Sequence, residues 1–256
     1  MSDHKFIFHE ENDQIASLRL QREDVNLLNI EMIEEVCSVL QSLSDGRSLK
    51  AFVFEAAGKV FCAGLDYSGH GPESIDKLLH AYHRMFRLLQ RLECPTVASV
   101  QGAALGAGCE LACFCDLVLA SENARFGLPE IKTGLFSPLA AADFFHYAHL
   151  KHLYEMLLVG DAITAEEARI MGLVNKVYAA SEFETRCREF IYRLTANPGA
   201  TLRLVKKAVR AGLERRFPES LAETEGIFLR ELMATEQAKE GIAAISTRLT
   251  KYDIEL

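Results

Sequence analysis

Two spacings of apolar side chains alternate along the first half of the chain. Short apolar runs with strand character predict strands at residues 5–9, 15–20, 50–56, 96–100 and 116–120. Between them, residues 29–43 and 75–92 place apolar side chains every three or four positions, the period of an amphipathic helix, and a short helix is predicted at 109–114. A unit of strand, loop and helix thus recurs about every forty-five residues, which favours an α/β architecture of stacked units.

After Pro138 the pattern becomes almost entirely helical. The predicted helices lie at residues 140–148, 153–159, 164–171, 182–196, 200–213, 218–232 and 236–250. The run Asn197-Pro198-Gly199 is the clearest boundary signal, since proline and glycine both interrupt regular structure. We therefore expect an α/β core at residues 1–197 and a C-terminal helical region at 198–256.

Composition narrows the class of protein further. A chain of 256 residues, 49% hydrophobic and 25% charged, suits one large globular domain or a domain with a small appendage. The formal net charge of -8 makes nucleic acid a poor partner, although a small anionic ligand remains compatible with a local basic cluster. No apolar run approaches the length of a membrane span, and residues 1–11 lack the apolar core of a signal peptide. We expect a cytoplasmic protein without membrane contact.

The sequence does not favour a metal site. None of the seven cysteines forms a Cys-x-x-Cys pair, and Cys109, Cys113 and Cys115 have no second cluster with which to hold zinc. His146, His149 and His152 recur every third residue, a spacing that drifts around a helix. We expect the cysteines to be buried thiols and no metal to be bound.

A turn rich in small residues, 102–108, lies between a predicted strand and the helix that begins near Cys109. Free N–H groups at a helix start favour negative charge, so the turn can form an oxyanion hole; tight packing of helix on strand is the alternative. Leu111 replaces the third glycine of a dinucleotide fingerprint, and no Walker lysine follows. A second loop, 61–66, could also direct backbone amides into a site.

Two glutamates stand where burial is expected. Glu110 begins an apolar helix, and Glu130 follows Pro129, which predicts a place in a first helical turn. Each can simply complement a helix dipole, but two buried carboxyl groups can also act as an acid–base pair. Glycoside hydrolysis uses such pairs as well, yet it would require aromatic sugar platforms and the chain has no tryptophan. A Gly-x-Ser-x-Gly nucleophile turn is absent from the sequence.

Taken in order and spacing, these segments resemble the crotonase, or enoyl-CoA hydratase/isomerase, superfamily along essentially the whole chain. The segments that carry the resemblance are residues 26–29, 61–66, 102–110, 126–130, 160–168 and 172–175. The resemblance implies an α/β spiral of ββα units with a C-terminal helical region that trimerises. It also implies self-association to a homotrimer, or to a hexamer of two stacked trimers.

The resemblance implies roles for particular residues. The backbone N–H groups of Leu65 and Ala107 would hold the thioester oxygen of an acyl-CoA, while Glu110 accepts a proton from water and Glu130 delivers one to the α-carbon. Coenzyme A is part of the substrate, and no cofactor or metal is required. The residues expected to contact substrate or its coenzyme A are Asn26, Leu27, Ala63, Gly64, Asp66, Gly106, Phe136, Ser137, Lys251 and Tyr252.

The chain departs from the family pattern after Glu130, where many members have a glycine-rich stretch. Phe136 and Pro138 are bulkier and stiffer, and the segment is similar to that of hydratases acting on cyclic dienoyl-CoA esters in anaerobic aromatic degradation. Both glutamates being present favours hydration. The alternatives are an isomerase that uses Glu130 alone and, in another class, a non-catalytic acyl-CoA-binding or RNA-binding homologue.

Overall fold

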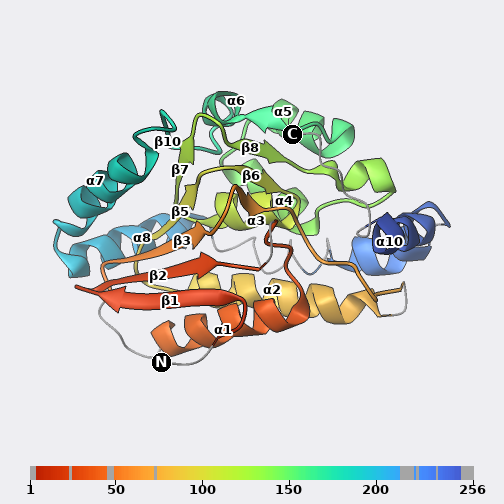
Figure 1. Ribbon diagram of the computed structural model, residues 1–256, viewed down its shortest axis with the longest axis horizontal. Coiled ribbons are helices and arrows are strands. Elements are labelled where there is room, and N and C mark those ends of the chain that lie inside the picture. Colours follow the sequence, from red (N-terminus) through yellow and green to blue (C-terminus); the bar gives the residue numbers. More distant parts are fainter. Residues whose placement is uncertain are drawn as a thin grey trace.

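The computed structural model describes residues 4–22, 25–44, 49–71, 74–213, 222, 225–234 and 236–248. Its main sheet has six strands, in the order β1-β2-β3-β5-β7-β10 (Figure 1). β1 is antiparallel to β2 and the remaining pairs are parallel. The strands are β1 (Ile7–Asn12), β2 (Ile15–Leu20), β3 (Ala51–Ala56), β5 (Thr96–Val100), β7 (Leu117–Ser121) and β10 (Lys176–Tyr178). The predicted strands are confirmed with small shifts, whereas β10 was not predicted and lies between the predicted helices at 164–171 and 182–196.

A second sheet of four short strands was not predicted from the sequence. Its order is β4-β6-β8-β9, and the first three strands are parallel. The strands are β4 (Val60–Cys62), β6 (Ala103–Leu105), β8 (Arg125–Gly127) and β9 (Ile163–Thr164). Strands of two or three residues are too short for alternation to show, so the sequence pattern does not predict them as strands.

The main sheet is covered on both faces, which explains its nearly continuous apolar strands. Along β3, Phe52 and Phe54 point into the large core, while Val53 between them faces α7 (Phe183–Thr195). Leu119 on β7 also joins the cluster against α7. α1 (Ile30–Ser44) and α2 (Ile75–Arg91) lie side by side beneath the sheet in Figure 1. The predicted helices at 29–43 and 75–92 are confirmed.

Beyond Pro138 the chain is mostly helical, as predicted, apart from β9 and β10. The α-helices are α4 (Pro138–Asp143), α5 (Leu150–Val159), α6 (Ala165–Ile170), α7, α8 (Gly199–Leu213) and α10 (Glu236–Arg248). The shorter helical turns are η2 (Phe144–His146), η3 (Ile227–Glu231) and η4 (Leu232–Ala234). Of the predicted helix at 218–232, the described residues are 222 and 225–232.

Two contacts fasten the C-terminal helices to the core. On α8, the buried Lys206 ammonium lies 2.6 Å from Asp116 Oδ2 and donates to the Cys94 carbonyl at 2.7 Å. On α10, Gly241 lies directly against the carbonyl of Thr133, where any Cβ would overlap that oxygen. Thr133 closes η1 (Pro129–Thr133), the turn that carries Glu130, so α10 packs on the back of this element.

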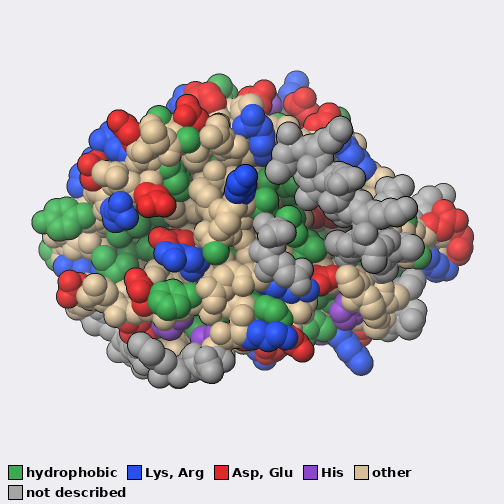
Figure 2. Space-filling view, in the orientation of Figure 1, with side chains coloured by type: hydrophobic (Ala, Val, Ile, Leu, Met, Phe, Trp, Pro, Cys, Tyr) green, Lys and Arg blue, Asp and Glu red, His purple; other side chains and the backbone are tan. Residues whose placement is uncertain are grey.

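The places of the cysteines, of the apolar helices and of the surface charges can be compared with the predictions made from composition. All seven cysteines are buried free thiols, as predicted. Among the described helices, none has the length and apolar character needed to cross a membrane. On the face shown in Figure 2, acidic and basic side chains are interspersed rather than gathered into separate patches.

Candidate active site

The three parallel strands of the second sheet end at one place, and the predicted site residues follow them. Leu65 comes after β4, Gly106 and Ala107 follow β6, and Glu130 comes after β8. The register pairs Cys62 with Ala104 and Leu105 with Gly127. Because the carboxyl ends of parallel strands meet at one edge, segments about twenty to forty residues apart converge there.

Glycines allow these segments to approach closely. Gly108 in α3 (Ala107–Phe114) lies against the carbonyl of Cys62, where a Cβ would overlap the oxygen. Gly106 has φ +53° and ψ -123°, a conformation that side chains disfavour, and a Cβ there would overlap Glu130 Oε1. The Gly106 N–H donates to the Gly127 carbonyl at 2.8 Å, which ties this turn to β8. The turn at 102–108 therefore serves both close packing and the placement of Glu130.

Glu110 is buried in the first turn of α3, with only 2% of its surface exposed. Its Oε1 accepts the Ala140 N–H at 2.7 Å, and its Oε2 accepts the Tyr82 hydroxyl at 2.8 Å. These two donors come from α4 and α2, so three elements fix the plane of this carboxyl group. A carboxylate has about four acceptor positions, which leaves further lone pairs for a water molecule.

Glu130 lies in the first turn of η1 behind Pro129, as the sequence predicted, although the turn is a 3-10 helix. Ser137 Oγ donates to Glu130 Oε2 at 2.9 Å. Gly134 ends the turn in the left-handed conformation, φ +78°, which redirects the chain toward Ser137. The segment after Glu130 therefore returns to hold the carboxyl group it follows.

Loss of solvation favours the neutral form of both carboxyl groups. Loss of solvation and the neighbouring charge of Glu130 raise the pKa of Glu110 to about 8, although the Ala140 and Tyr82 hydrogen bonds oppose the rise. Burial also raises the pKa of Glu130, and the Ser137 hydrogen bond again opposes it. Raised pKa values bring both carboxyl groups closer to neutral pH, where acids and bases that exchange protons work best.

The two predicted oxyanion-hole amides flank the same edge. Leu28 pairs with Leu65 in an isolated parallel bridge, in which the Leu28 N–H bonds to Gly64 O and the Asp66 N–H to Leu28 O, each at 2.9 Å. The N–H of Leu65 therefore points away from Leu28. Ala107 is the first residue of α3, so its N–H has no acceptor within the helix.

The loop around Leu65 is held by polar contacts that the sequence did not reveal. Arg22 donates to Asp66 Oδ2 at 2.6 Å and to the Leu27 carbonyl at 2.7 Å. Burial opposes the charge on Asp66, but hydrogen bonds from Ser68 and Arg22 outweigh it and lower the pKa of this carboxyl group. Asp66 thus fixes the loop, and Arg22 holds Asp66 in place. The position of Arg22 just before the 26–29 motif is the one signal in the sequence that could have pointed to this role.

Asn26 is fully buried, and its amide is used by the backbone. Its Oδ1 accepts the Arg22 N–H at 2.8 Å, and its Nδ2 donates to the carbonyls of Ala57 and Val60 at 3.0 Å each. We therefore expect Asn26 to act by placing Leu27 and Leu28 rather than by touching coenzyme A. Ala63 is partly exposed and donates its N–H to Val25 O at 3.0 Å, beside the buried Gly64.

Aromatic side chains surround the glutamates. Phe136 stacks edge-to-face on Phe228 of η3, with ring centroids 5.1 Å apart, so a C-terminal turn packs against the segment after Glu130. Tyr67 is buried; its burial and the charges of Glu130 and Glu110 raise the pKa of its hydroxyl. Tyr67 and Tyr82 were both missed from the sequence, where they read as ordinary core aromatics. Lys251 and Tyr252 lie outside the described residues.

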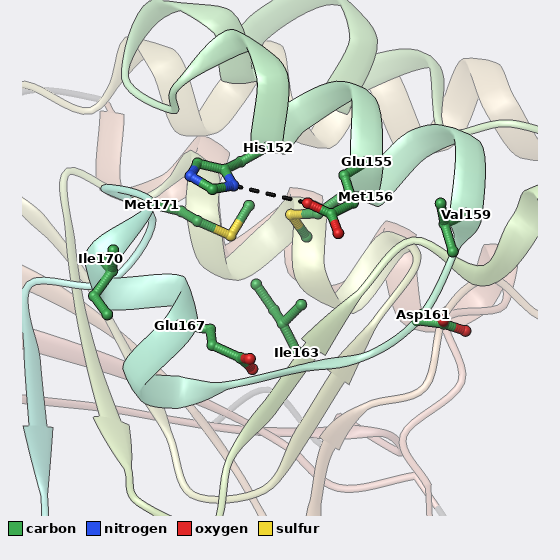
Figure 3. Close-up of a pocket in the computed structure, with 9 residues that line it drawn as sticks. All are labelled: His152, Glu155, Met156, Val159, Asp161, Ile163, Glu167, Ile170 and Met171. Carbon is green, nitrogen blue, oxygen red and sulfur yellow. Dashed lines mark ion pairs between the residues drawn. The ribbon is translucent and has the colours of Figure 1, made fainter.

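A separate pocket of about 230 Å³ lies between α5 and α6 (Figure 3). Its walls contain none of the predicted site residues. The lining residues are His152, Glu155, Met156, Val159, Asp161, Ile163, Glu167, Ile170 and Met171. His152 Nδ1 and Glu155 Oε2 are 3.8 Å apart in a side-by-side ion pair on one helix. This pocket is therefore distinct from the edge of the second sheet where Glu110 and Glu130 lie.

The site thus joins a fully buried carboxyl group, Glu110, to a partly buried one, Glu130, and the pKa of each is raised. The model of the Enoyl-CoA hydratase/isomerase family matches residues 10–253, and the chain belongs to this family. It is an enzyme of the crotonase superfamily, with the mixed α/β fold predicted from its sequence.

Known relatives and structures agree with this assignment. The chain is 30% identical over 241 residues to a probable enoyl-CoA hydratase of Mycobacterium bovis, with 93% of each chain covered. It is 31% identical over 227 residues to the 2,3-dehydroadipyl-CoA hydratase of Escherichia coli, covering 88% of this chain and 89% of the relative. A crystal structure of an enoyl-CoA hydratase from Mycobacterium avium subsp. paratuberculosis superposes with a TM-score of 0.86 at 28% identity, covering 95% of this chain and 96% of the other.

Proposed function

We propose that the protein is a hydro-lyase that adds water to a C=C bond conjugated to a coenzyme A thioester. The observation that carries this proposal is the pair Glu110 and Glu130 at one site, each with a raised pKa and each held by a hydroxyl group. Hydration needs one group that accepts a proton and another that donates one. Relatives named as enoyl-CoA hydratases support this choice of reaction.

The proposed reaction has two proton transfers. Ionised Glu110 removes a proton from water, whose oxygen bonds to the β-carbon, and the electron pair of the C=C bond moves toward the thioester oxygen. The resulting enolate collapses as protonated Glu130 delivers its proton to the α-carbon. The residues themselves supply the proton transfers, and coenzyme A is required only as part of the substrate.

The amides of Leu65 and Ala107 are proposed to hold the enolate oxygen. Proline at position 107 should abolish activity, because proline removes one N–H and yet suits the first position of a helix. Loss of one oxyanion donor typically costs about a hundredfold to a thousandfold in rate. Steady-state kinetics of Ala107→Pro measure this, with circular dichroism as the control for folding; wild-type turnover would show that the Ala107 N–H has no role.

The acyl group is proposed to be compact or cyclic. Phe136 and its partner Phe228 form a wall of two packed rings, and packed walls yield little to a long flexible chain. A panel of straight-chain enoyl-CoA and cyclic dienoyl-CoA thioesters, assayed by loss of the conjugated absorbance, tests both the reaction and the substrate. We expect a higher kcat/KM for a cyclic dienoyl-CoA than for crotonyl-CoA. The reverse order, with a further rise for longer chains, would contradict a compact pocket.

The coenzyme A moiety is proposed to lie along Leu27, Ala63 and Gly64, whose backbone borders the site. Lys251 or Tyr252 of a neighbouring subunit is proposed to reach the nucleotide phosphates, because an otherwise acidic protein needs local positive charge there.

A closed homotrimer, alone or stacked as a hexamer, is proposed on the basis of apolar surface. Leu158, Val159 and Ile170 on α5 and α6 are each more than half exposed, as are Val205 and Val209 on α8. A threefold ring joins two different surfaces of each subunit, and these two regions are candidates for them. Met233 and Ile242 are apolar as well, but they are buried within the chain. Light scattering after gel filtration should give a multiple of three chains; a 28.5 kDa monomer with full activity would contradict it.

A further inference from the structure

The hydroxyl of Tyr82 stands between two acceptors in the interior of the protein. Tyr82 lies on α2, its side chain is fully buried, and its ring packs edge-to-face on Phe86 with centroids 4.8 Å apart. The hydroxyl oxygen is 2.8 Å from Glu110 Oε2 and 3.1 Å from the carbonyl oxygen of Ala107. A hydroxyl group has one hydrogen, so it can donate to only one of these oxygens at a time.

We propose that Tyr82 is a positioning residue that holds Glu110 in both protonation states of the catalytic cycle by moving its hydroxyl hydrogen between Glu110 and the Ala107 carbonyl. This inference rests on the proposed hydratase function. It concerns a residue outside every motif that identifies the family.

The hydrogen bonds balance in each state. When Glu110 is ionised, Oε2 accepts from Tyr82 and Oε1 accepts from the Ala140 N–H. When Glu110 has taken a proton from water, that proton needs an acceptor, which an N–H group cannot provide. Once this proton lies on Oε2 and has turned toward Tyr82, the Tyr82 oxygen accepts it, and the Tyr82 hydrogen turns to the Ala107 carbonyl. Tyr82 stays neutral throughout, and no buried hydrogen-bonding group is left without a partner.

The surroundings keep the phenol protonated. Burial and the charge of Glu110, together with Cys62 on β4 and Glu130 on η1, raise the pKa of Tyr82 well above its ordinary value. The titratable groups that face Glu110 are therefore Glu130 from η1, Tyr67 from the loop after β4 and Tyr82 from α2. Of these, Tyr82 is the group whose hydrogen bond favours the ionised form of Glu110.

Phenylalanine at position 82 removes the hydroxyl and keeps the ring. In the wild type, kcat/KM should rise with pH as Glu110 ionises, because burial raises the pKa of this carboxyl group and only its ionised form accepts a proton. In Tyr82→Phe the stabilising hydrogen bond is lost, so this rise should move to higher pH. A hydrogen bond to a charged group predicts a fall in kcat of about tenfold to a hundredfold. KM should change little, since Tyr82 does not touch substrate.

Tyr147→Phe is the matched control. The Tyr147 hydroxyl donates to the carboxylate of Asp143 at 3.0 Å, away from both glutamates, so its loss should leave the pH profile unchanged. A fluorinated tyrosine introduced at position 82 should shift the pH profile of kcat/KM in the direction opposite to Tyr82→Phe. It is a stronger donor with the same shape, so it should move the rise of kcat/KM to lower pH and remain informative even where Tyr82→Phe fails to fold.

The outcomes separate two claims. Opposite shifts for Tyr82→Phe and fluorotyrosine, with Tyr147→Phe unchanged, support the positioning role. An active wild type whose pH profile neither substitution moves overturns the inference about Tyr82 and leaves the hydratase proposal standing. A wild type that hydrates none of the enoyl-CoA thioesters in the panel overturns the hydratase proposal itself.

Discussion

Glutamine in place of Glu110 is expected to lower kcat for hydration by at least about a hundredfold, the usual range for loss of an acid–base group. Glutamine has nearly the same shape but cannot accept a proton from water. Its carbonyl oxygen can accept the Ala140 N–H, and its amide can donate to the Tyr82 hydroxyl oxygen, which then donates to Ala107. The hydrogen bonds around the site therefore survive, and the loss of rate reports chemistry rather than folding.

Glu130→Gln should have an effect of the same size, because an amide cannot supply the proton that the α-carbon needs. The Ser137 hydroxyl can still donate to the glutamine carbonyl oxygen, so the segment after Glu130 should keep its place. Glu166→Gln is a suitable control, since Glu166 is an exposed carboxylate paired with Arg169 on α6. Turnover near that of the wild type in either active-site variant would contradict the assignment. A strong loss in Glu130→Gln alone would instead favour the isomerase alternative.

Alanine at Gly106 is expected to reduce kcat/KM by at least about a hundredfold, the size of loss expected when a catalytic acid is misplaced. Its Cβ would overlap Glu130 Oε1, so the carboxyl group must leave its position. The backbone at φ +53° and ψ -123° adds strain, and the turn also positions the Ala107 N–H.

Gly69→Ala separates strain from displacement. Gly69 has φ +74°, but a Cβ there meets nothing within 4 Å. This variant should therefore be destabilised by its backbone and remain active. Steady-state kinetics measure kcat/KM of Gly106→Ala and Gly69→Ala, and thermal melting measures the stability of each variant. Equal activity in the two would show that close contact between Gly106 and Glu130 is not required.

The main sheet and the long helices could be predicted from the sequence because their patterns are long enough to repeat. β2 and β3, together with α1 and α2, each place several core side chains at a regular period. The second sheet could not be predicted, since β4, β6 and β8 have only three residues each and owe their geometry to pairing with distant segments. The candidate site lies at the ends of these strands. That the segments after β4, β6 and β8 meet there was therefore implied only by the resemblance to the family.

The residues of the candidate site differ in whether the sequence alone could point to them. Glu110 and Glu130 stand in recognisable local motifs and could be found. Tyr82 could not, because it lies 28 residues from Glu110 on the apolar face of α2, where it reads as a core aromatic. Asn26 is predicted beside the ligand, and only the structure reveals that its amide also bonds to the carbonyls of Ala57 and Val60 and to the Arg22 N–H. Only three-dimensional contacts separate these roles.

The fate of a labelled water molecule tests the central claim most directly. The protein is incubated with the most reactive thioester of the panel in water enriched in heavy oxygen, and the product is analysed by mass spectrometry. The account predicts a product heavier than the substrate by one labelled water, formed by the wild type and not by Glu110→Gln. A product of unchanged mass with a displaced double bond, or no product from any thioester, would contradict it.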